Sequence, residues 1–448
     1  MTNIKVNFDR IVTDMKPMHA VNNGPVHKFA ADQRISNLEY YAAAGIPFAR
    51  THDAAFFATY GGEHTVDVHA VFPDFDKDPH DPASYDFQLT DEYLKTIKAA
   101  GTEPFFRLGS KIEHASKKYG TLPPKDFKKW AVICEHIIRH YTEDFADGLN
   151  MKITYWEIWN EPDLDPDDST HKRCWGGTKK QFFEFYDIAA THLKKCFPHL
   201  KIGGPASSNL NGPWVREFLS ELKAPLDFFS WHVYSNDPYK IAELCTYARN
   251  LLDEYGFKDT ESILNEWNYV KGWHNDDWVY SLKSEKSLKG AAFTAQTMSL
   301  CQNEPLDLLM YYDARPCAMN GLFCTDIPSE RLKGYYPFVM FNTLYKLGKN
   351  VHSESDTREI SVCAATDSKD YAVMLTYYDD NDGAGEKKCE INLSGFGEVS
   401  CFEIEYYLLD DKHDLELVRR ERFTSRNFTA FLTLTLNSSY LIKIKPVD

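Results

Sequence analysis

Two glutamates stand where apolar runs of the sequence give way to polar residues. Glu161 lies between Asn160 and Pro162 in the stretch TYWEIWNEPDLDPDD (154–168), and Glu266 lies in the shorter run SILNEW. Two carboxyl groups can break a glycosidic bond, because one protonates the leaving oxygen while the other attacks the anomeric carbon or activates water. Nearby aromatic rings can stack on sugar rings. The two glutamates are therefore candidates for catalysis on a sugar.

Repeated strand and helix patterns must position these glutamates. Apolar runs read as strands at 16–21, 46–52, 102–109, 152–160, 200–206, 226–234, 262–267 and 306–314. Helical spacing occurs at 32–45, 89–101, 125–141, 178–196, 213–222, 239–256, 289–303 and 335–348, and several of these segments end in Gly, a helix stop signal. Eight strands that alternate with helices predict an α/β fold, the (β/α)8 TIM barrel. A doubly wound open sheet is the alternative, but the sequence has no G-x-G-x-x-G loop.

From about residue 351 the sequence shows strand patterns without long helical segments. Five stretches read as strands joined by turns: EISVCAATDSKDYAVMLTYYDD, KKCEINLSGFG, CFEIEYYLLDD, FTAFLTLTLN and SYLIKIK. We predict a catalytic barrel over 15–347 and an accessory β-sandwich-like domain over 348–448. Residues 1–14 should join that domain, because their run IKVNFD needs a strand partner outside the barrel.

The polar residues that follow the barrel strands should converge, because the active sites of such barrels lie at the C-terminal ends of the strands. Glu161 follows the fourth strand and Glu266 ends the seventh, so the two can face each other across a bound sugar. The other strand-end residues that we single out are Arg50, His52, Asp53, His232, Tyr234 and Asp313.

The motifs WEIWNEPD and ILNEW together resemble those of the retaining glycoside hydrolases of clan A. The His-x-Tyr of SWHVY, the early FARTHD and the C-terminal β-domain resemble glycoside hydrolase family 39, which contains β-xylosidases and α-L-iduronidases. The resemblance covers roughly residues 15 to 347. It implies that Glu161 is the acid/base and Glu266 the nucleophile, that Asn160 bonds the sugar 2-hydroxyl, and that Arg50 keeps Glu266 ionised.

The same resemblance implies roles for the remaining rim residues. His232 and Tyr234 would line the side of the nucleophile, while His52 and Asp53 would bind hydroxyls of the terminal sugar. Trp267 and Asp313 are further candidates for contact with the substrate. The end of the eighth strand reads MYYDARPCAMNG and lacks the aromatic YW pattern of the xylosidases, which leaves the sugar open. Trp156 and Trp159 are expected in the core, since strand residues alternate in direction.

Composition excludes several classes of partner. The net charge of −16 argues against nucleic acid and anionic membranes. No run reaches the roughly 18 apolar residues of a membrane span, and the N-terminus has no signal pattern. Ten scattered cysteines without a C-x-x-C pair are typical of thiols in a reducing cytoplasm, which is the expected location. A carbohydrate is the expected partner, and a homo-oligomer is left open.

Two acidic runs, DFDKDPHD and DLDPDD, begin like calcium loops. Neither has the Gly at position six or the Glu at position twelve that an EF-hand requires. We therefore expect no metal and no cofactor.

The resulting hypothesis is a retaining exo-glycosidase of β-xylosidase type. Another exo-glycosidase (an arabinosidase, glucosidase or iduronidase-like enzyme), a non-catalytic sugar-binding relative and an enzyme that cuts polysaccharides internally are the alternatives. The long insert 54–89 favours a capped pocket over an open cleft.

Overall fold

A closed barrel of eight strands forms the larger part of the molecule. The computed structural model describes residues 1–27, 35–54, 62, 64–397 and 401–447, so residues 55–61 and 63 of the 54–89 insert lie outside the described residues. The barrel strands are β2 (Ala20–Asn22), β3 (Phe48–Thr51), β4 (Glu103–Arg107), β5 (Tyr155–Glu157), β6 (Lys201–Ser207), β7 (Phe228–Ser235), β8 (Glu261–Tyr269) and β9 (Leu308–Tyr311). They pair in parallel, and β2 with β9 closes the ring. Every predicted barrel strand contains or overlaps an observed one, so the predicted TIM barrel is confirmed.

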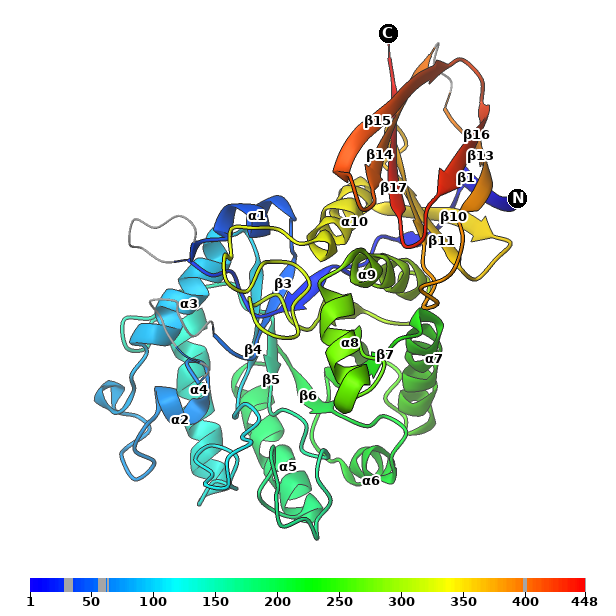
Figure 1. Ribbon diagram of the computed structural model, residues 1–448. Coiled ribbons are helices and arrows are strands. Elements are labelled where there is room, and N and C mark those ends of the chain that lie inside the picture. Colours follow the sequence, from blue (N-terminus) through cyan, green and yellow to red (C-terminus); the bar gives the residue numbers. More distant parts are fainter. Residues whose placement is uncertain (28–34, 55–61, 63, 398–400, 448) are drawn as a thin grey trace.

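Helices surround the barrel (Figure 1). The predicted ones are α1 (Leu38–Ala43), α3 (Gln88–Ala99), α4 (Phe127–Thr142), α5 (Lys179–Cys196), α6 (Pro213–Glu221), α7 (Pro238–Glu254), α9 (Leu288–Cys301) and α10 (Tyr336–Leu347). Local signals set their ends: Thr178 and Gln181 form a capping box at the start of α5, and Gly348 ends α10 in the left-handed conformation. The sequence analysis missed α2 (Val68–Val71), α8 (Asn275–Glu285) and the 3-10 turns η2 (Pro82–Ser84) and η3 (Lys333–Tyr335).

The barrel interior has an apolar layer and a polar layer. Side chains from five strands form the apolar layer: Ala20, Phe105, Phe228, Ile263, Leu308 and Met310. Phe48 and Tyr155 pack on this layer, and Arg50 and Glu157 follow two residues later on the same strands. Because strand residues alternate in direction, Arg50 and Glu157 also point into the barrel, nearer its C-terminal end.

The outward-facing strand residues pack against the helices. Trp156 is fully buried and stacks on Phe106, and Trp159 lies 6.1 Å from Trp130 of α4 between ring centroids. The expectation that both tryptophans belong to the core is confirmed.

The accessory domain is one nine-stranded sheet. Its strands are β1 (Thr2–Asp14), β10 (Lys349–Ser355), β11 (Ile360–Thr366), β12 (Tyr371–Tyr377), β13 (Lys387–Ser394), β14 (Phe402–Leu409), β15 (Asp414–Phe423), β16 (Asn427–Leu434) and β17 (Ser439–Pro446). β1 lies between β10 and β13, so both ends of the chain enter this sheet (Figure 1). Arg419 on the edge strand β15 donates to Phe431 O on the other edge strand, β16, so this single sheet curls until its edges approach each other. The division into two sandwich layers stays a prediction.

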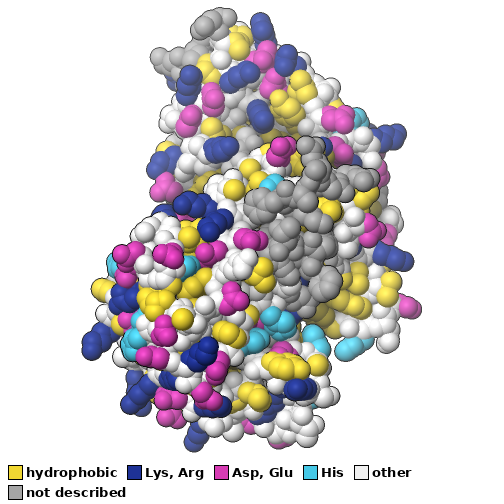
Figure 2. All heavy atoms as spheres, turned by 90° about the vertical axis from the view of Figure 1, so that its left-hand side faces the viewer, with side chains coloured by type: hydrophobic (Ala, Val, Ile, Leu, Met, Phe, Trp, Pro, Cys, Tyr) yellow, Lys and Arg dark blue, Asp and Glu magenta, His cyan; other side chains and the backbone are white. Residues whose placement is uncertain are grey.

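The surface of the molecule is charged, and its cysteines are not joined in disulfides. Acidic and basic side chains are interspersed over the face shown in Figure 2. Within the described residues, none of the helices has both the length and the apolar character that a membrane span requires. All ten cysteines are free thiols.

Candidate active site

Glu161 and Glu266 meet at the C-terminal end of the barrel. Glu161 lies in the loop after β5 and Glu266 lies on β8. One carboxylate oxygen from each and a ring nitrogen of His232 all lie within 4.8 Å of one another. Glu161 has a φ of 47°, a conformation that is uncommon outside glycine and is concentrated at functional sites. The two glutamates that the sequence singled out therefore share one site.

Arg50 joins the polar groups beneath the two glutamates. Its Nη1 donates to Glu266 Oε1 at 2.8 Å, its Nε donates to Glu157 Oε2 at 2.7 Å, and its Nη2 donates to Asn160 Oδ1 at 2.7 Å. The guanidinium is fully buried, and the carboxylates of Glu157 and Glu266 raise its pKa against the opposing effect of burial. Within the described residues Nδ2 of Asn160 has no hydrogen-bond partner, so it can donate to a substrate hydroxyl.

Glu157 is a buried carboxylate that the sequence analysis did not select. Besides Arg50, it accepts hydrogen bonds at Oε1 from the Ser230 hydroxyl at 2.6 Å and from Asn265 Nδ2 at 2.5 Å. A buried charge is tolerated only when it is paired and hydrogen-bonded, and these contacts meet that condition. Glu157 thus supplies a second buried counter-charge to Arg50, besides Glu266.

His232 connects the two catalytic candidates, and Tyr234 contacts one of them. Nδ1 of His232 lies 2.8 Å from Glu161 Oε1 and 3.4 Å from Glu266 Oε2. The Tyr234 hydroxyl donates to Glu266 Oε2 at 2.8 Å. Both side chains therefore lie beside Glu266 as expected, but His232 also contacts Glu161, and contacts it more closely.

The environment separates the protonation states of these groups. Burial, reinforced by the nearby charge of Asp163, raises the pKa of Glu161 to about 7. Burial also lowers the pKa of His232 to about 4, so its imidazole is neutral at pH 7. Glu161 can therefore carry a proton near neutral pH, as a general acid requires.

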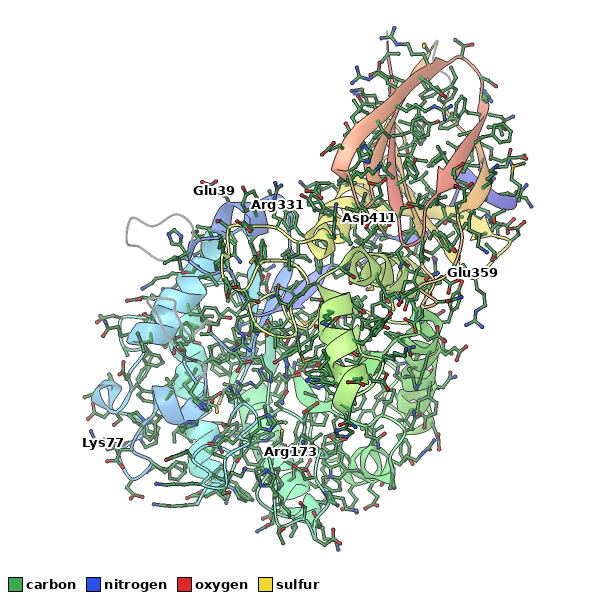
Figure 3. The ribbon with its side chains drawn as sticks, in the orientation of Figure 1. Glu39, Lys77, Arg173, Arg331, Glu359 and Asp411 are labelled. Atoms are coloured by element: carbon green, nitrogen blue, oxygen red, sulfur yellow. The ribbon has the colours of Figure 1, made fainter. Side chains whose placement is uncertain are left out.

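The acidic run after β5 is held by the protein's own donors. Asp163 accepts from the Ser207 hydroxyl at 2.6 Å and from the backbone N of Ser208 at 2.8 Å. Asp165 forms an ion pair with Arg173, labelled in Figure 3, at 2.7 Å. These contacts account for both carboxylates and fix the loop that carries Glu161.

His52 lies beside Glu266 and contacts Asp53, and both His52 and Asp53 are almost fully buried. His52 Nε2 is 3.5 Å from Glu266 Oε1, and its Nδ1 is 3.1 Å from Asp53 Oδ2. Lys111 and Arg315 each approach an oxygen of Asp53 to 3.3 Å. Although burial acts to raise it, His52, Arg315 and Lys111 hold the pKa of Asp53 well below its usual value. Asp53 is thus an anion able to accept from sugar hydroxyls.

Asp313 is bound by neighbouring side chains and backbone. It accepts from Asn23 Nδ2 at 2.8 Å and from the backbone N of Arg315 at 2.7 Å, and it is fully buried. Asn23 Oδ1 in turn accepts from the backbone N of Asp53 at 2.6 Å. These contacts make Asp313 a support for Arg315 and Asp53, and the sugar contact suggested for it stays a prediction.

Trp267 does not reach the site, which corrects the expectation that it contacts the substrate. It is fully buried, and its ring lies 6.1 Å from Phe293 of α9 and 5.5 Å from Tyr311. Adjacent strand residues point in opposite directions, so Trp267 faces outward because Glu266 faces inward.

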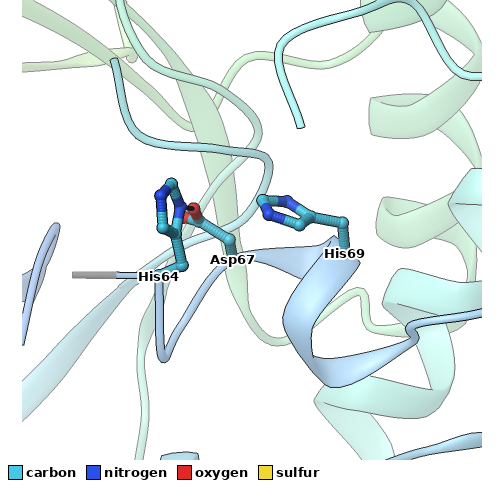
Figure 4. A group of neighbouring side chains, drawn as sticks. All are labelled: His64, Asp67 and His69. Carbon is cyan, nitrogen blue, oxygen red and sulfur yellow. Dashed lines mark hydrogen bonds and ion pairs between the residues drawn. The ribbon is translucent and has the colours of Figure 1, made fainter. Parts of the chain in front are cut away.

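Figure 4 shows a group of two histidines and an aspartate: His64, Asp67 and His69. Asp67 accepts from His64 Nδ1 at 2.6 Å and from Arg107 Nη2 at 2.7 Å, and the same Nη2 donates to His52 O. Ligand atoms of His64, Asp67 and His69 lie within 4.8 Å of one another, a spacing that suits a metal. The Asp67 carboxylate also pairs with the buried Arg107 cation. This ion pair accounts for the buried carboxylate without a metal ion.

Most of the site residues that the sequence analysis missed also follow the end of a predicted barrel strand, so the same search for polar residues at strand ends could have found them. Asn22 and Asn23 follow the first apolar run, and Lys111 follows the third. Arg315 comes two residues after Asp313. Glu157 is different, because its signal is a charge inside an apolar run.

Comparisons with known proteins agree with this fold and identify a family. A model of the glycosyl hydrolases family 39 matches residues 60–297. A β-xylosidase from Geobacillus stearothermophilus is 30% identical over 170 residues, which are 35% of this chain and 32% of that protein. A β-xylosidase from Caldicellulosiruptor saccharolyticus is 28% identical over 163 residues, 34% of this chain and 32% of that protein. The aligned part thus spans about a third of these curated relatives.

A solved structure extends the similarity to the whole fold. The glucosidase from Croceicoccus marinus superposes with a TM-score of 0.82 at 21% identity, covering 100% of this chain and 99% of that one. At this identity the likeness concerns the fold alone. The family match covers more than half of the chain, and the chain belongs to the glycosyl hydrolases of family 39.

Proposed function

We propose that this protein is a retaining exo-glycosidase of β-xylosidase type, with Glu266 as the nucleophile and Glu161 as the acid/base. The observation that carries the proposal is the approach of their carboxylate oxygens to within 4.8 Å. Retaining glycosidases separate the two carboxyl groups by about 5–5.5 Å, whereas inverting ones leave about 6.5–9.5 Å for a water molecule. The spacing here favours direct attack by Glu266.

The first step uses the unequal charges of the two groups. Glu266, ion-paired to Arg50, attacks the anomeric carbon as a carboxylate. Glu161, whose raised pKa keeps its proton near pH 7, gives that proton to the leaving oxygen. The products of this step are a glycosyl ester on Glu266 and the released alcohol.

The second step reverses the role of Glu161. As a carboxylate, Glu161 takes a proton from a water molecule, and the resulting hydroxide attacks the anomeric carbon of the ester. Glu266 then leaves as a carboxylate beside Arg50. Tyr234, which donates to Glu266 Oε2, fixes which oxygen of Glu266 faces the sugar.

The proposed substrate is a β-xyloside with a terminal xylosyl residue. Support comes from the two relatives that are called β-xylosidases. In this proposal Asn160 Nδ2 donates to the 2-hydroxyl, and the Asp53 carboxylate accepts from hydroxyls farther from the scissile bond. The capped pocket predicted from the 54–89 insert remains part of the proposal.

A panel of nitrophenyl glycosides tests this function. It should contain β-xyloside, α-L-arabinofuranoside, β-glucoside and α-L-iduronide. We expect fastest release from the β-xyloside, with β-xylose as the first sugar seen by proton NMR before mutarotation. Initial release of α-xylose would refute retention. Binding of sugars without turnover on any member of the panel would indicate a non-catalytic relative.

A further inference from the structure

A stacked pair of tryptophans, of which Trp273 is exposed, lies at the edge of the site. Trp273 belongs to the loop between β8 and α8, and its ring stacks on Trp278 of α8 with centroids 5.3 Å apart and planes 23° apart. Trp273 is 50% exposed, although burying an aromatic ring of this size is strongly favourable. The stack holds one indole in a fixed orientation toward solvent.

This pair connects to the attacking carboxylate through a single residue. The Trp273 ring lies 5.0 Å from the Tyr234 ring in an edge-on arrangement, with an angle of 78° between the planes. The Tyr234 hydroxyl donates to Glu266 Oε2. Trp273 is therefore one aromatic ring away from the carboxylate that attacks the sugar.

The position of Trp273 differs from that of the groups assigned to the terminal sugar. His52, Asp53 and Asn160 are at most 3% exposed, as suits a sugar that is held during the reaction. The leaving group must depart to solvent, so its contacts must lie on an open side of the site. A half-exposed indole beside Tyr234 meets that requirement and offers a flat face to the CH groups of a sugar ring.

We propose that Trp273, backed by Trp278, binds the ring on the leaving-group side of the scissile bond. The ligand class is a neutral pyranose of an oligosaccharide or an aromatic aglycone, both of which can stack on an indole. This inference rests on the proposed glycosidase function and adds to it a binding site for the departing ring.

The test compares leaving groups with and without a ring on the same terminal sugar. Xylobiose releases a pyranose, whereas methyl β-xyloside releases methanol. For Trp273→Ala, kcat/KM should fall about tenfold more on xylobiose than on the methyl glycoside, the size expected from one lost aromatic contact. Trp273→Phe should recover most of the loss. Val279→Ala is the matched control, since Val279 is an equally exposed apolar residue of α8 at 48%.

Two outcomes would overturn the inference. Equal losses on both substrates would show that Trp273 shapes the catalytic groups and does not bind the ring. An unchanged kcat/KM on both would show that the tryptophan pair has no part in binding. Should the panel identify another terminal sugar, its disaccharide and its methyl glycoside replace the xylosides, so the two proposals can fail separately.

Binding of the leaving-group ring can also be measured in a variant that does not turn the substrate over. Glu266→Ala protein with and without Trp273→Ala is titrated with xylobiose in a calorimeter. The second substitution should raise Kd for xylobiose about tenfold and leave Kd for xylose within about twofold. The same change for both sugars would contradict a site for the leaving ring.

Discussion

Replacing Glu161 by Gln separates its two roles, because the amide keeps the shape of the carboxyl group but cannot give or take the proton. An unactivated sugar leaving group needs that proton, whereas nitrophenolate is stable as an anion. General acid catalysis contributes about 10²–10⁴-fold. The first step on xylobiose should therefore slow by about that factor in Glu161→Gln, while the first step on nitrophenyl β-xyloside slows far less.

The pH dependence of kcat/KM provides a second test of Glu161. In the parent, kcat/KM for xylobiose should fall as pH rises through about 7, the pKa to which burial and Asp163 raise Glu161. In Glu161→Gln, kcat/KM should not show this fall near pH 7.

The free energy of unfolding should show the same titration. The folded pKa of Glu161 lies above its unfolded value of about 4.3, so the protonated carboxyl stabilises the fold below that value. This stability is lost as pH rises toward about 7, by on the order of 3 kcal/mol. Glu161→Gln has no such loss, so its stability relative to the parent should increase between pH 5 and pH 8.

Stopped-flow release of nitrophenol and urea unfolding at both pH values are the assays. Because Glu161→Gln also lacks the base for the second step, a burst of nitrophenol should appear, and azide should give a β-xylosyl azide of retained configuration. Equal losses on both substrates without a burst would mean that Glu161 is not the acid/base. A stability difference that does not change with pH would refute the raised pKa.

Three further substitutions test the surrounding groups. Glu266→Ala should abolish turnover and leave the melting temperature near that of the parent, with azide giving at most a glycosyl azide of inverted configuration; activity within tenfold of the parent would contradict its role. His232→Ala should lower kcat/KM less than Glu266→Ala does, and a matching collapse in melting temperature would identify His232 as a core residue. Glu157→Gln leaves Arg50 short of one buried counter-charge and should lower the free energy of unfolding by about 3–5 kcal/mol in urea titrations; an unchanged midpoint would show that Arg50 does not need Glu157.

The sequence predicts the barrel well because each of its strands is a short apolar run with a clear end. The same feature identifies Glu161 and Glu266, which follow such runs. Helix α8 escaped prediction because it has little apolar face: its buried residues are Ser281, Ser284 and Glu285. Without an apolar stripe, the helical period leaves no trace in the pattern.

The wrong and missing predictions for residues near the site also have physical causes. Trp267 was expected beside the substrate because it is adjacent to Glu266 in the sequence, yet the alternation of strand residues turns it to α9. Glu157 lies inside the apolar run YWEIW and not at its end, so a search of strand ends does not find it, although a charge within such a run indicates a buried partner. Trp273 lies in a loop, and its contact with Tyr234 depends on a loop conformation that no period in the sequence encodes.

Two carboxyl groups this close can work only if their surroundings keep them in different protonation states. Arg50 and Tyr234 donate hydrogen bonds to Glu266, while burial and the charge of Asp163 raise the pKa of Glu161 to about 7. Formation of the glycosyl ester removes the charge of Glu266 and leaves Arg50 with less compensation. That cation then favours the ionised form of Glu161, since a nearby positive charge lowers a carboxyl pKa. In the proposed mechanism, the ester intermediate thus converts Glu161 from the acid of the first step into the base of the second.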